Sequence, residues 1–234
     1  MGLADDQRSM LLKVATALGN DMLNKVAFVG GCATGLLITD DYTREQVRGT
    51  DDVDLIIHII KYSKYEEVIK TLESKGFKRS GLEDEDCPTC AIKLGGLRVD
   101  LMPDTPILGS TNRWYKEALN NTIDIKLGDE IIIKVVNAPF FVATKLEAYN
   151  SRGNNDPLES RDIEDILNLI DGRQELEEEI KGCDNNLREY ISNEIKKLLH
   201  DDNFGYAIQS QARGNQDRED LILEKLESLI GETK

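Results

Sequence analysis

Two aspartates stand two residues apart at the start of a strongly apolar run. Asp52 and Asp54 open residues 52–60, whose other members are mostly valine, leucine and isoleucine. In a β-strand alternate side chains share a face, so the two carboxylates would lie roughly 6 to 7 Å apart on one side. That spacing suits a shared Mg²⁺ ion, which prefers oxygen ligands. The same D-x-D pattern also occurs as a solvated acidic loop, as at residues 84–86, but an unpartnered carboxylate in an apolar strand is costly.

A third carboxylate and two glycines complete the parts of a metal-dependent nucleotidyl transfer site. Asp100 lies inside the apolar run at residues 97–102, and Gly30 and Gly31 end another apolar run. Such a transfer needs metal ions that neutralise phosphate charge and hold the reacting oxygens in line. We expect Asp100 to close the metal site and to lie beside the acceptor hydroxyl. The two glycines would let the backbone approach a triphosphate closely.

The surrounding periodicity predicts the elements that must position these residues. Alternating or continuous apolar runs predict strands at residues 25–29, 53–60, 90–94, 97–102, 122–127 and 131–136, with Gly95 and Gly96 as a hairpin loop. Helical spacing predicts helices at residues 10–18, 32–37, 62–75 and 112–119, and residues 40–49 resemble a loop. After Pro139 the pattern is helical, at residues 140–149, 157–170, 185–199 and 216–230. We therefore predict an α+β fold, with a mixed-sheet α/β domain at residues 1–137 and a helical C-terminal region at residues 138–234 packed on it.

The charge, the apolar runs and the cysteines of the sequence disfavour several kinds of binding partner and site. With 44 acidic and 29 basic residues, the net charge of -15 disfavours broad, sequence-independent binding to nucleic acid. No apolar run approaches the ~20 residues of a membrane-spanning helix, so we expect a cytoplasmic protein without membrane contact. The four cysteines are too sparse for a disulfide framework. Cys87 and Cys90 form a single C-x-x-C without a second ligand pair, which favours ordinary thiols over a zinc site.

The order of these motifs resembles a known family. Glycines 30 and 31, then Arg48-x-Thr50-x-Asp52-Val53-Asp54, then Val99-Asp100 are similar to the DNA polymerase β-type nucleotidyltransferase superfamily. The continuation through Lys145, Arg152 and the Arg161-Asp162-x-x-Asp165 motif resembles the AbiEii-like nucleotidyltransferases, whose members include toxins of toxin–antitoxin systems. The resemblance covers about residues 25–170.

This resemblance implies roles for individual residues. Asp52, Asp54 and Asp100 would be catalytic and would bind Mg²⁺, with Mn²⁺ as the alternative ion. The nucleotide would be bound by Gly30, Gly31, Arg48, Thr50 and Lys145. Asp162, Asp165 and Arg152 would support Lys145. From the residues alone, the basic and acidic side chains of residues 145–165 could equally pair across a helix interface.

The leading interpretation is a Mg²⁺-dependent enzyme that moves a nucleoside monophosphate from an NTP to a hydroxyl and releases pyrophosphate. The acceptor would be an RNA 3′ end, a protein or a small molecule. The alternative is a non-catalytic nucleotide-sensing or partner-binding protein whose helical region docks an antitoxin-like partner. Three other residues are also candidates. We expect His58 to pack within the sheet rather than to act as a base. Trp114 and Tyr115 would either stack on a nucleobase or anchor their helix.

Overall fold

The fold combines a seven-stranded mixed sheet with α-helices, as seen in a computed structural model that describes residues 3–80, 89–128, 130–152 and 156–230. The chain divides into two compact units. The sheet unit comprises residues 1–33 and 48–137, and the helical unit comprises residues 34–47 and 138–234. The predicted α+β class with a mixed sheet is confirmed. Residues 34–47 group with the later helices rather than with the strands that precede and follow them in the sequence.

The sheet unit holds all seven strands and three helices of its own among the described residues. In chain order they are α1 (Leu3–Leu23), β1 (Val26–Val29), β2 (Asp52–Ile57), α4 (Tyr62–Ser74), β3 (Phe77–Arg79), β4 (Ala91–Leu94), β5 (Leu97–Pro103), α5 (Tyr115–Asn120), β6 (Thr122–Lys126) and β7 (Ile132–Val136). Helix α2 (Gly31–Leu37) follows β1, and the boundary between the units falls inside it.

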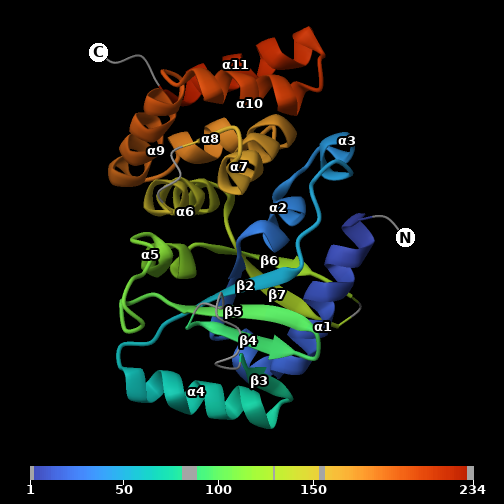
Figure 1. Ribbon diagram of the computed structural model, residues 1–234, viewed down its shortest axis with the longest axis vertical. Helices are drawn as coiled ribbons and strands as arrows, with labels where there is room; N and C mark the ends of the chain where they lie inside the picture. The colour runs from blue at the N-terminus through green and yellow to red at the C-terminus, as the bar shows by residue number, and fades with distance from the viewer. Residues whose placement is uncertain (1–2, 81–88, 129, 153–155, 231–234) are drawn as a thin grey trace. The chain divides into compact units, whose positions relative to one another are not determined.

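The strand order is β3-β4-β5-β2-β1-β7-β6. Strands β2 and β5 pair in parallel, as do β1 and β7, and the other neighbours are antiparallel. Figure 1 shows the strands side by side, with α4 next to the edge strand β3. Gly95 and Gly96 join β4 to β5, and Gly95 alone has a positive φ of 64°, the sign pattern of a type II′ hairpin turn. The predicted hairpin is confirmed.

The core of the sheet unit follows the apolar periodicity of the sequence. Leu11, Val14 and Leu18 of α1 are fully buried, at the spacing that puts one helix face on the sheet. The helical geometry is interrupted at Gly19, where φ is 67° and ψ is 166°. In β2 the alternate residues Val53 and Leu55 are buried while Asp52 and Asp54 are half-buried. The pleat therefore sends the apolar set into the core and the two aspartates to the other face.

The helical unit is built around a helix that is buried almost all round. Its elements are α3 (Asp41–Arg44), α6 (Ala138–Ser151), α7 (Arg161–Gly172), α8 (Leu176–Lys181), α9 (Asn185–Leu198), α10 (Asp202–Ala212) and α11 (Gln216–Ile230). Every residue from Ala138 to Leu146 of α6 is buried. Helix α6 packs against α7, α8 and α9, and α11 packs against α7, α9 and α10 (Figure 1). A helix segment that is buried on every side needs neighbours on every side, which the later amphipathic helices provide.

Helices α8 and α10 lie outside the predicted helix ranges, and two short elements, α3 and β3, also differ from the prediction. The predicted loop at residues 40–49 contains α3, whose first turn is capped because the Asp40 carboxylate accepts a hydrogen bond from the backbone N–H of Thr43 at 2.6 Å. The three residues of β3 were not predicted as a strand. They form a strand because they pair in antiparallel fashion with β4, which lies more than ten residues further along the chain. A local sequence pattern does not show such a pairing. The acidic loop at residues 84–86 and Cys87 lie outside the described residues.

Candidate functional site

Three carboxylates share one face of the central sheet. Asp54 of β2 and Asp100 of β5 are direct partners in the parallel register, where neighbouring backbones lie about 4.8 Å apart. Asp52 precedes Asp54 by two residues on the same strand and therefore points to the same side. Asp100 is buried, whereas the other two are half-buried. Tertiary pairing thus brings together the carboxylates that the sequence placed in two separate runs.

Gly30 lies directly against this cluster. Its φ is +75°, and a Cβ built on it would stand 2.6 Å from Cγ and 2.8 Å from Cβ of Asp54. Those distances are too short for real atoms, so only glycine leaves room for the Asp54 side chain. Gly31 begins α2, and the backbone N–H of Ala33 donates to the carbonyl of Gly30 at 3.0 Å. The backbone at Gly30 therefore does make a close approach, as expected, and within the described residues the group it approaches is the Asp54 carboxylate.

Arg98 binds the third carboxylate, a contact that the sequence reasoning missed. Its Nε and Nη2 atoms donate to the two oxygens of Asp100 at 2.8 and 2.5 Å, which makes a bidentate, charge-assisted pair. Arg98 also stands opposite Asp52 in the parallel register. The alternation rule that paired Asp52 with Asp54 would have placed Arg98 and Asp100 on one face too. The signal was present in the R-x-D spacing of residues 98–100.

Residues before the D-x-D pair hold its first member in place. Thr50 Oγ1 donates a short hydrogen bond to Asp52 Oδ1, which fixes the orientation of that carboxylate. The Gln7 side-chain amide donates to the carbonyl oxygen of Arg48 at 3.0 Å, so α1 anchors the segment that leads into β2. Asp51, between Thr50 and Asp52, is exposed. The structure thus distinguishes the half-buried Asp52 from the exposed Asp51, although both residues are aspartates.

Mg²⁺ fits this cluster by donor chemistry, because carboxylate oxygens on one face are the ligands that the ion prefers. The Arg98 guanidinium, however, takes up both oxygens of Asp100 in the described conformation. Within the ranges that the structure describes, no group of three or more aspartate, glutamate, histidine or cysteine side chains is arranged to hold a metal. Asp52 and Asp54 are the two half-buried carboxylates of the cluster, and the oxygens of Asp100 are bound to Arg98.

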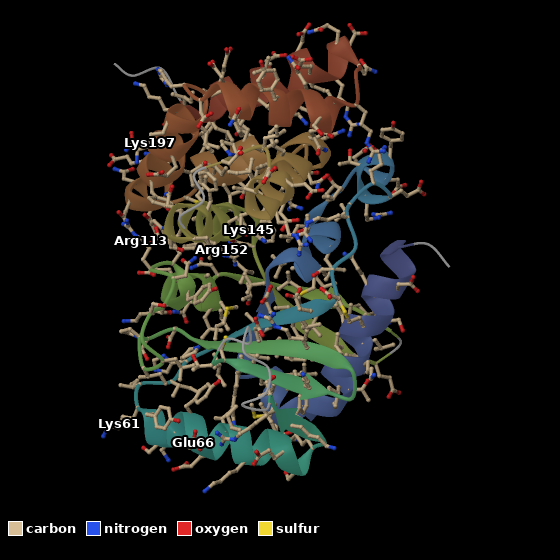
Figure 2. The ribbon with its side chains drawn as sticks, viewed as in Figure 1. Lys61, Glu66, Arg113, Lys145, Arg152 and Lys197 are labelled. Atoms are coloured by element: carbon tan, nitrogen blue, oxygen red, sulfur yellow. The ribbon has the colours of Figure 1, made fainter. Side chains whose placement is uncertain are left out.

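The remaining predicted site residues form a second group, in the helical unit. Lys145 of α6 is buried, and its Nζ lies 3.0 Å from Asp162 Oδ1 and 2.6 Å from Asp165 Oδ2, both on α7. Arg152 follows α6 and reaches the other oxygen of Asp162 at 3.2 Å. Figure 2 labels Lys145 and Arg152. Two cations and two carboxylates thus form a charge-balanced cluster, the pairing across helices that the residue spacing allowed.

Three aromatic and imidazole candidates receive structural roles. Trp114 is buried at the start of α5, and Tyr115 directs its hydroxyl to Met102 Sδ at 3.1 Å. Both anchor α5 on the sheet unit. The expectation that His58 packs within the sheet is wrong: it lies just beyond β2, its side chain is 56 % exposed, and Nδ1 is 2.7 Å from the buried Asp104. The strand ends one residue earlier, so the side chain is released from the sheet.

Cys90 lies beside β5 as an inert thiol. It precedes β4, and its carbonyl oxygen accepts from the backbone N–H of Leu101 at 2.9 Å. Burial, and next the negative charge of Asp100, raise the pKa of Cys90 to about 12. A thiol with such a pKa stays protonated at neutral pH and is a poor metal ligand or nucleophile. Its C-x-x-C partner Cys87 lies outside the described residues.

Comparisons of the sequence leave the family open. No protein-family model matches the chain, and no curated protein matches it. Within the described residues, each helix is too short or too polar to span a bilayer.

Proposed function

We propose that this protein is a Mg²⁺-dependent nucleotidyltransferase of the DNA polymerase β-type superfamily, similar to the AbiEii-like group. It would transfer a nucleoside monophosphate from an NTP to a hydroxyl acceptor. The hydroxyl oxygen attacks the α-phosphorus, the bond from that phosphorus to the bridging oxygen breaks, and pyrophosphate leaves with the electron pair. The acceptor class is an RNA end, a protein or a small molecule.

The observation that carries the proposal is the register between β2 and β5. It pairs Asp54 with Asp100, while the alternation of β2 adds Asp52 to the same face. Bringing three carboxylates together at the centre of a sheet is electrostatically unfavourable unless cations offset their charge. Arg98 supplies one such cation. A divalent ion between Asp52 and Asp54 would supply the other.

Each carboxylate then has a distinct task. Asp52, oriented by Thr50, and Asp54, seated against Gly30, would hold Mg²⁺, or Mn²⁺ in its place. Bound there, the ion supplies neutralisation of phosphate charge and alignment of the attacking and leaving oxygens. Asp100 would complete the ligand set and accept the proton of the acceptor hydroxyl. Arg98 holds Asp100 in position until then, and its guanidinium would afterwards be available to the phosphates.

The nucleotide would be bound by the backbone at Gly30 and Gly31 and by Arg48 and Thr50, which flank the carboxylates in the sequence. The family resemblance assigns Lys145 a charge toward the triphosphate, and within the helical unit this lysine is held by its own partners. Its pairs with Asp162 and Asp165 fix the direction of the ammonium group in the helical unit, and Arg152 offsets the second charge of that carboxylate pair. The proposal therefore assigns Asp162, Asp165 and Arg152 to positioning rather than to substrate contact.

Metal-dependent nucleotide binding tests this proposal. Purified protein would be titrated with each labelled NTP in the presence of Mg²⁺ and again with a chelator, and pyrophosphate release would be followed with a panel of acceptors. We expect binding of at least one NTP that requires the metal. Asp52→Asn and Asp54→Asn should each weaken it on the order of 100-fold, since each removes an ionic metal ligand.

Asp51→Asn is the matched control, because it makes the same chemical change at an exposed neighbouring position. It should bind as the parent does. If all three variants behave alike, the metal site is assigned to the wrong carboxylates. If the parent binds no NTP with or without metal, the nucleotidyltransferase proposal fails.

One observation favours the non-catalytic alternative. The bidentate Arg98–Asp100 pair neutralises the carboxylate that would activate the acceptor. A protein that senses nucleotides without turnover would bind an NTP in the same metal-dependent way and release no pyrophosphate with any acceptor. The two readouts of the experiment above therefore separate the alternatives.

A further inference from the structure

Strand β6 lies at the opposite end of the sheet from β3, and its outer edge has no strand partner among the described residues. The other edge strand, β3, is only three residues long, and its Arg79 is tied to Glu66 and Glu73 of α4. Strand β6 has five residues, of which Asp124 and Lys126 are exposed. An edge of this kind presents backbone N–H and C=O groups that can pair with an added strand.

The pairing with β7 determines which residues of β6 face this outer edge. The backbone N–H of Leu127, the residue after β6, donates to the carbonyl oxygen of Ile131 at 2.9 Å, in the same register that joins β6 to β7. Hydrogen-bonded pairs alternate along an antiparallel ladder, so the odd-numbered residues of β6 bond to β7. The backbone groups of Thr122, Asp124 and Lys126 therefore point outward.

One hydrogen bond reaches the outer edge within the part of the chain that the structure describes. Arg8 of α1 donates from Nη2 to the carbonyl oxygen of Lys126 at 2.7 Å. A carbonyl oxygen has two lone pairs, so it can accept a second bond. The edge therefore still offers the N–H and C=O groups of Asp124 and both backbone groups of Lys126 to another strand.

The outward residues of β6 are complementary to the same residues in a second copy of the chain. Two identical strands that pair across a twofold axis run antiparallel. With the axis beside Ile125, Asp124 of each copy lies opposite Lys126 of the other, and the outward backbone groups of both residues form hydrogen bonds. Opposite charges directly across an antiparallel pair are stabilising. The strand edge is thus self-complementary in both charge and hydrogen bonding.

Neighbouring registers lack this complementarity. An axis beside Asp124 would place the two copies of this carboxylate opposite each other, which is unfavourable. An axis beside Ile123 would place Lys126 opposite Asn120, which belongs to α5 and not to a strand. The register centred on Ile125 is therefore the one that the charges select.

We propose that β6 pairs with β6 of a second copy of this chain in the register centred on Ile125. The contact joins the two seven-stranded sheets into one continuous sheet. Two Asp124–Lys126 ion pairs form on one face, and the half-buried Ile125 side chains of the two copies meet on the other. The proposal concerns the sheet unit alone and holds whether or not its carboxylates transfer nucleotides.

Sedimentation velocity of the full chain over a range of concentrations tests the proposal. Interfaces that bury less than about 1,200 Å² are usually weak, so we expect a reversible dimer with a dissociation constant on the order of 10 µM. The net charge of -15 opposes association. The measurement is therefore made at roughly 0.15 M salt, where charges more than about 8 Å apart are largely screened.

Exchanging the two charges tests the ion pairs. Asp124→Lys and Lys126→Asp each place like charges opposite one another twice, so each should weaken the dimer at least about tenfold. Both residues are exposed, and the combined variant restores opposite charges. It should return to within about threefold of the parent constant. Asp51→Lys makes the first change at an exposed residue outside β6 and should dimerise as the parent does.

Cysteine cross-linking tests the register. In Ile125→Cys the two thiols would occupy a non-hydrogen-bonded pair with Cα atoms about 4.5 Å apart, within the range of a disulfide. Ile123→Cys is the matched control, because Ile123 is half-buried on the same face of β6. Its two copies would lie more than roughly 13 Å apart along the strands, too far for a disulfide. The oxidised parent accounts for the native cysteines.

We expect a covalent dimer of Ile125→Cys alone, and circular dichroism establishes that each variant is folded. The proposal is overturned if the parent stays monomeric at every concentration, which would leave the edge to a different chain or to none. It is also overturned if the folded double charge variant does not recover the dimer, or if Ile123→Cys cross-links as readily as Ile125→Cys.

Discussion

The side chain of Asp54 occupies the space that a Cβ on Gly30 would need. A Cβ on Gly30 would stand 2.6 Å from Cγ of Asp54, and Gly30 already has a φ of +75° that favours glycine. The two residues are 24 positions apart in the sequence, and the antiparallel pairing of β1 with β2 brings them together. The glycine turn and the D-x-D pair are therefore one structural feature.

Replacing Gly30 by alanine should damage both stability and metal binding. The positive φ costs about 1–3 kcal/mol for a residue with a Cβ. The overlap with Asp54 adds to this cost and displaces the carboxylate. Thermal or chemical unfolding measures the first effect, and titration with Mn²⁺ measures the second.

Two other glycines separate these contributions. Gly76 has a φ of +96° with no heavy atom within 4 Å of a built Cβ, so Gly76→Ala reports the backbone strain alone. Gly96 has neither a positive φ nor a neighbour, and Gly96→Ala should change the unfolding free energy by no more than about 0.5 kcal/mol. Equal effects of Gly30→Ala and Gly76→Ala would show that the contact with Asp54 contributes nothing.

Removing Arg98 should tighten metal binding. The guanidinium and a divalent ion compete for the Asp100 carboxylate, so Arg98→Met frees the ligand and should raise Mn²⁺ affinity about tenfold, the worth of one charge-assisted hydrogen bond. Isothermal titration or electron paramagnetic resonance measures this change. Lys78→Met removes one exposed cation from the edge strand β3 and serves as the control for net charge. Unchanged affinity in Arg98→Met would mean that Asp100 takes no part in binding the ion.

Lys145 should contribute far more to stability than Arg152. Lys145→Met leaves the carboxylates of Asp162 and Asp165 buried without their central cation and should lower the unfolding free energy by about 3–5 kcal/mol. Arg152 is 70 % exposed, so Arg152→Met should cost less than about 1 kcal/mol. Urea denaturation compares the two. A small effect of Lys145→Met would show that the ion cluster relaxes without it.

Cys90 should resist alkylation in the folded protein. Its pKa is raised to about 12 by burial and by the charge of Asp100, so at pH 8 its thiolate population falls on the order of 1000-fold below that of an ordinary thiol. Because the folded pKa exceeds the unfolded one, near 9.0, this thiol stabilises the fold below pH 9 and loses that contribution as the pH rises toward 12. Iodoacetamide labelling of a Cys87→Ser variant, read by mass spectrometry, measures the rate. Equal labelling rates in buffer and in urea would contradict the raised pKa.

Local patterns were sufficient for most elements of the fold. The apolar run of residues 53–60, the helical spacing of residues 62–75 and the Gly95–Gly96 loop each depend on neighbours in the chain. Each predicted element formed, although the strand ends at Ile57, three residues before its predicted end. Helices α8 and α10 and the short elements α3 and β3 were not predicted. A four-residue helix depends on one capping carboxylate, and a three-residue edge strand depends on a partner far from it in the sequence.

In the candidate site, too, some relationships follow from the local sequence and others only from the tertiary structure. The sequence by itself determined that Asp52 and Asp54 share a face, because side-chain alternation is a property of one strand. Only the tertiary structure decided that Asp100 stands opposite Asp54, that Gly30 must be glycine because of Asp54, and that Arg98 holds Asp100. These relationships depend on the register between strands, which is set by the packing of the whole sheet and not by any local run of residues.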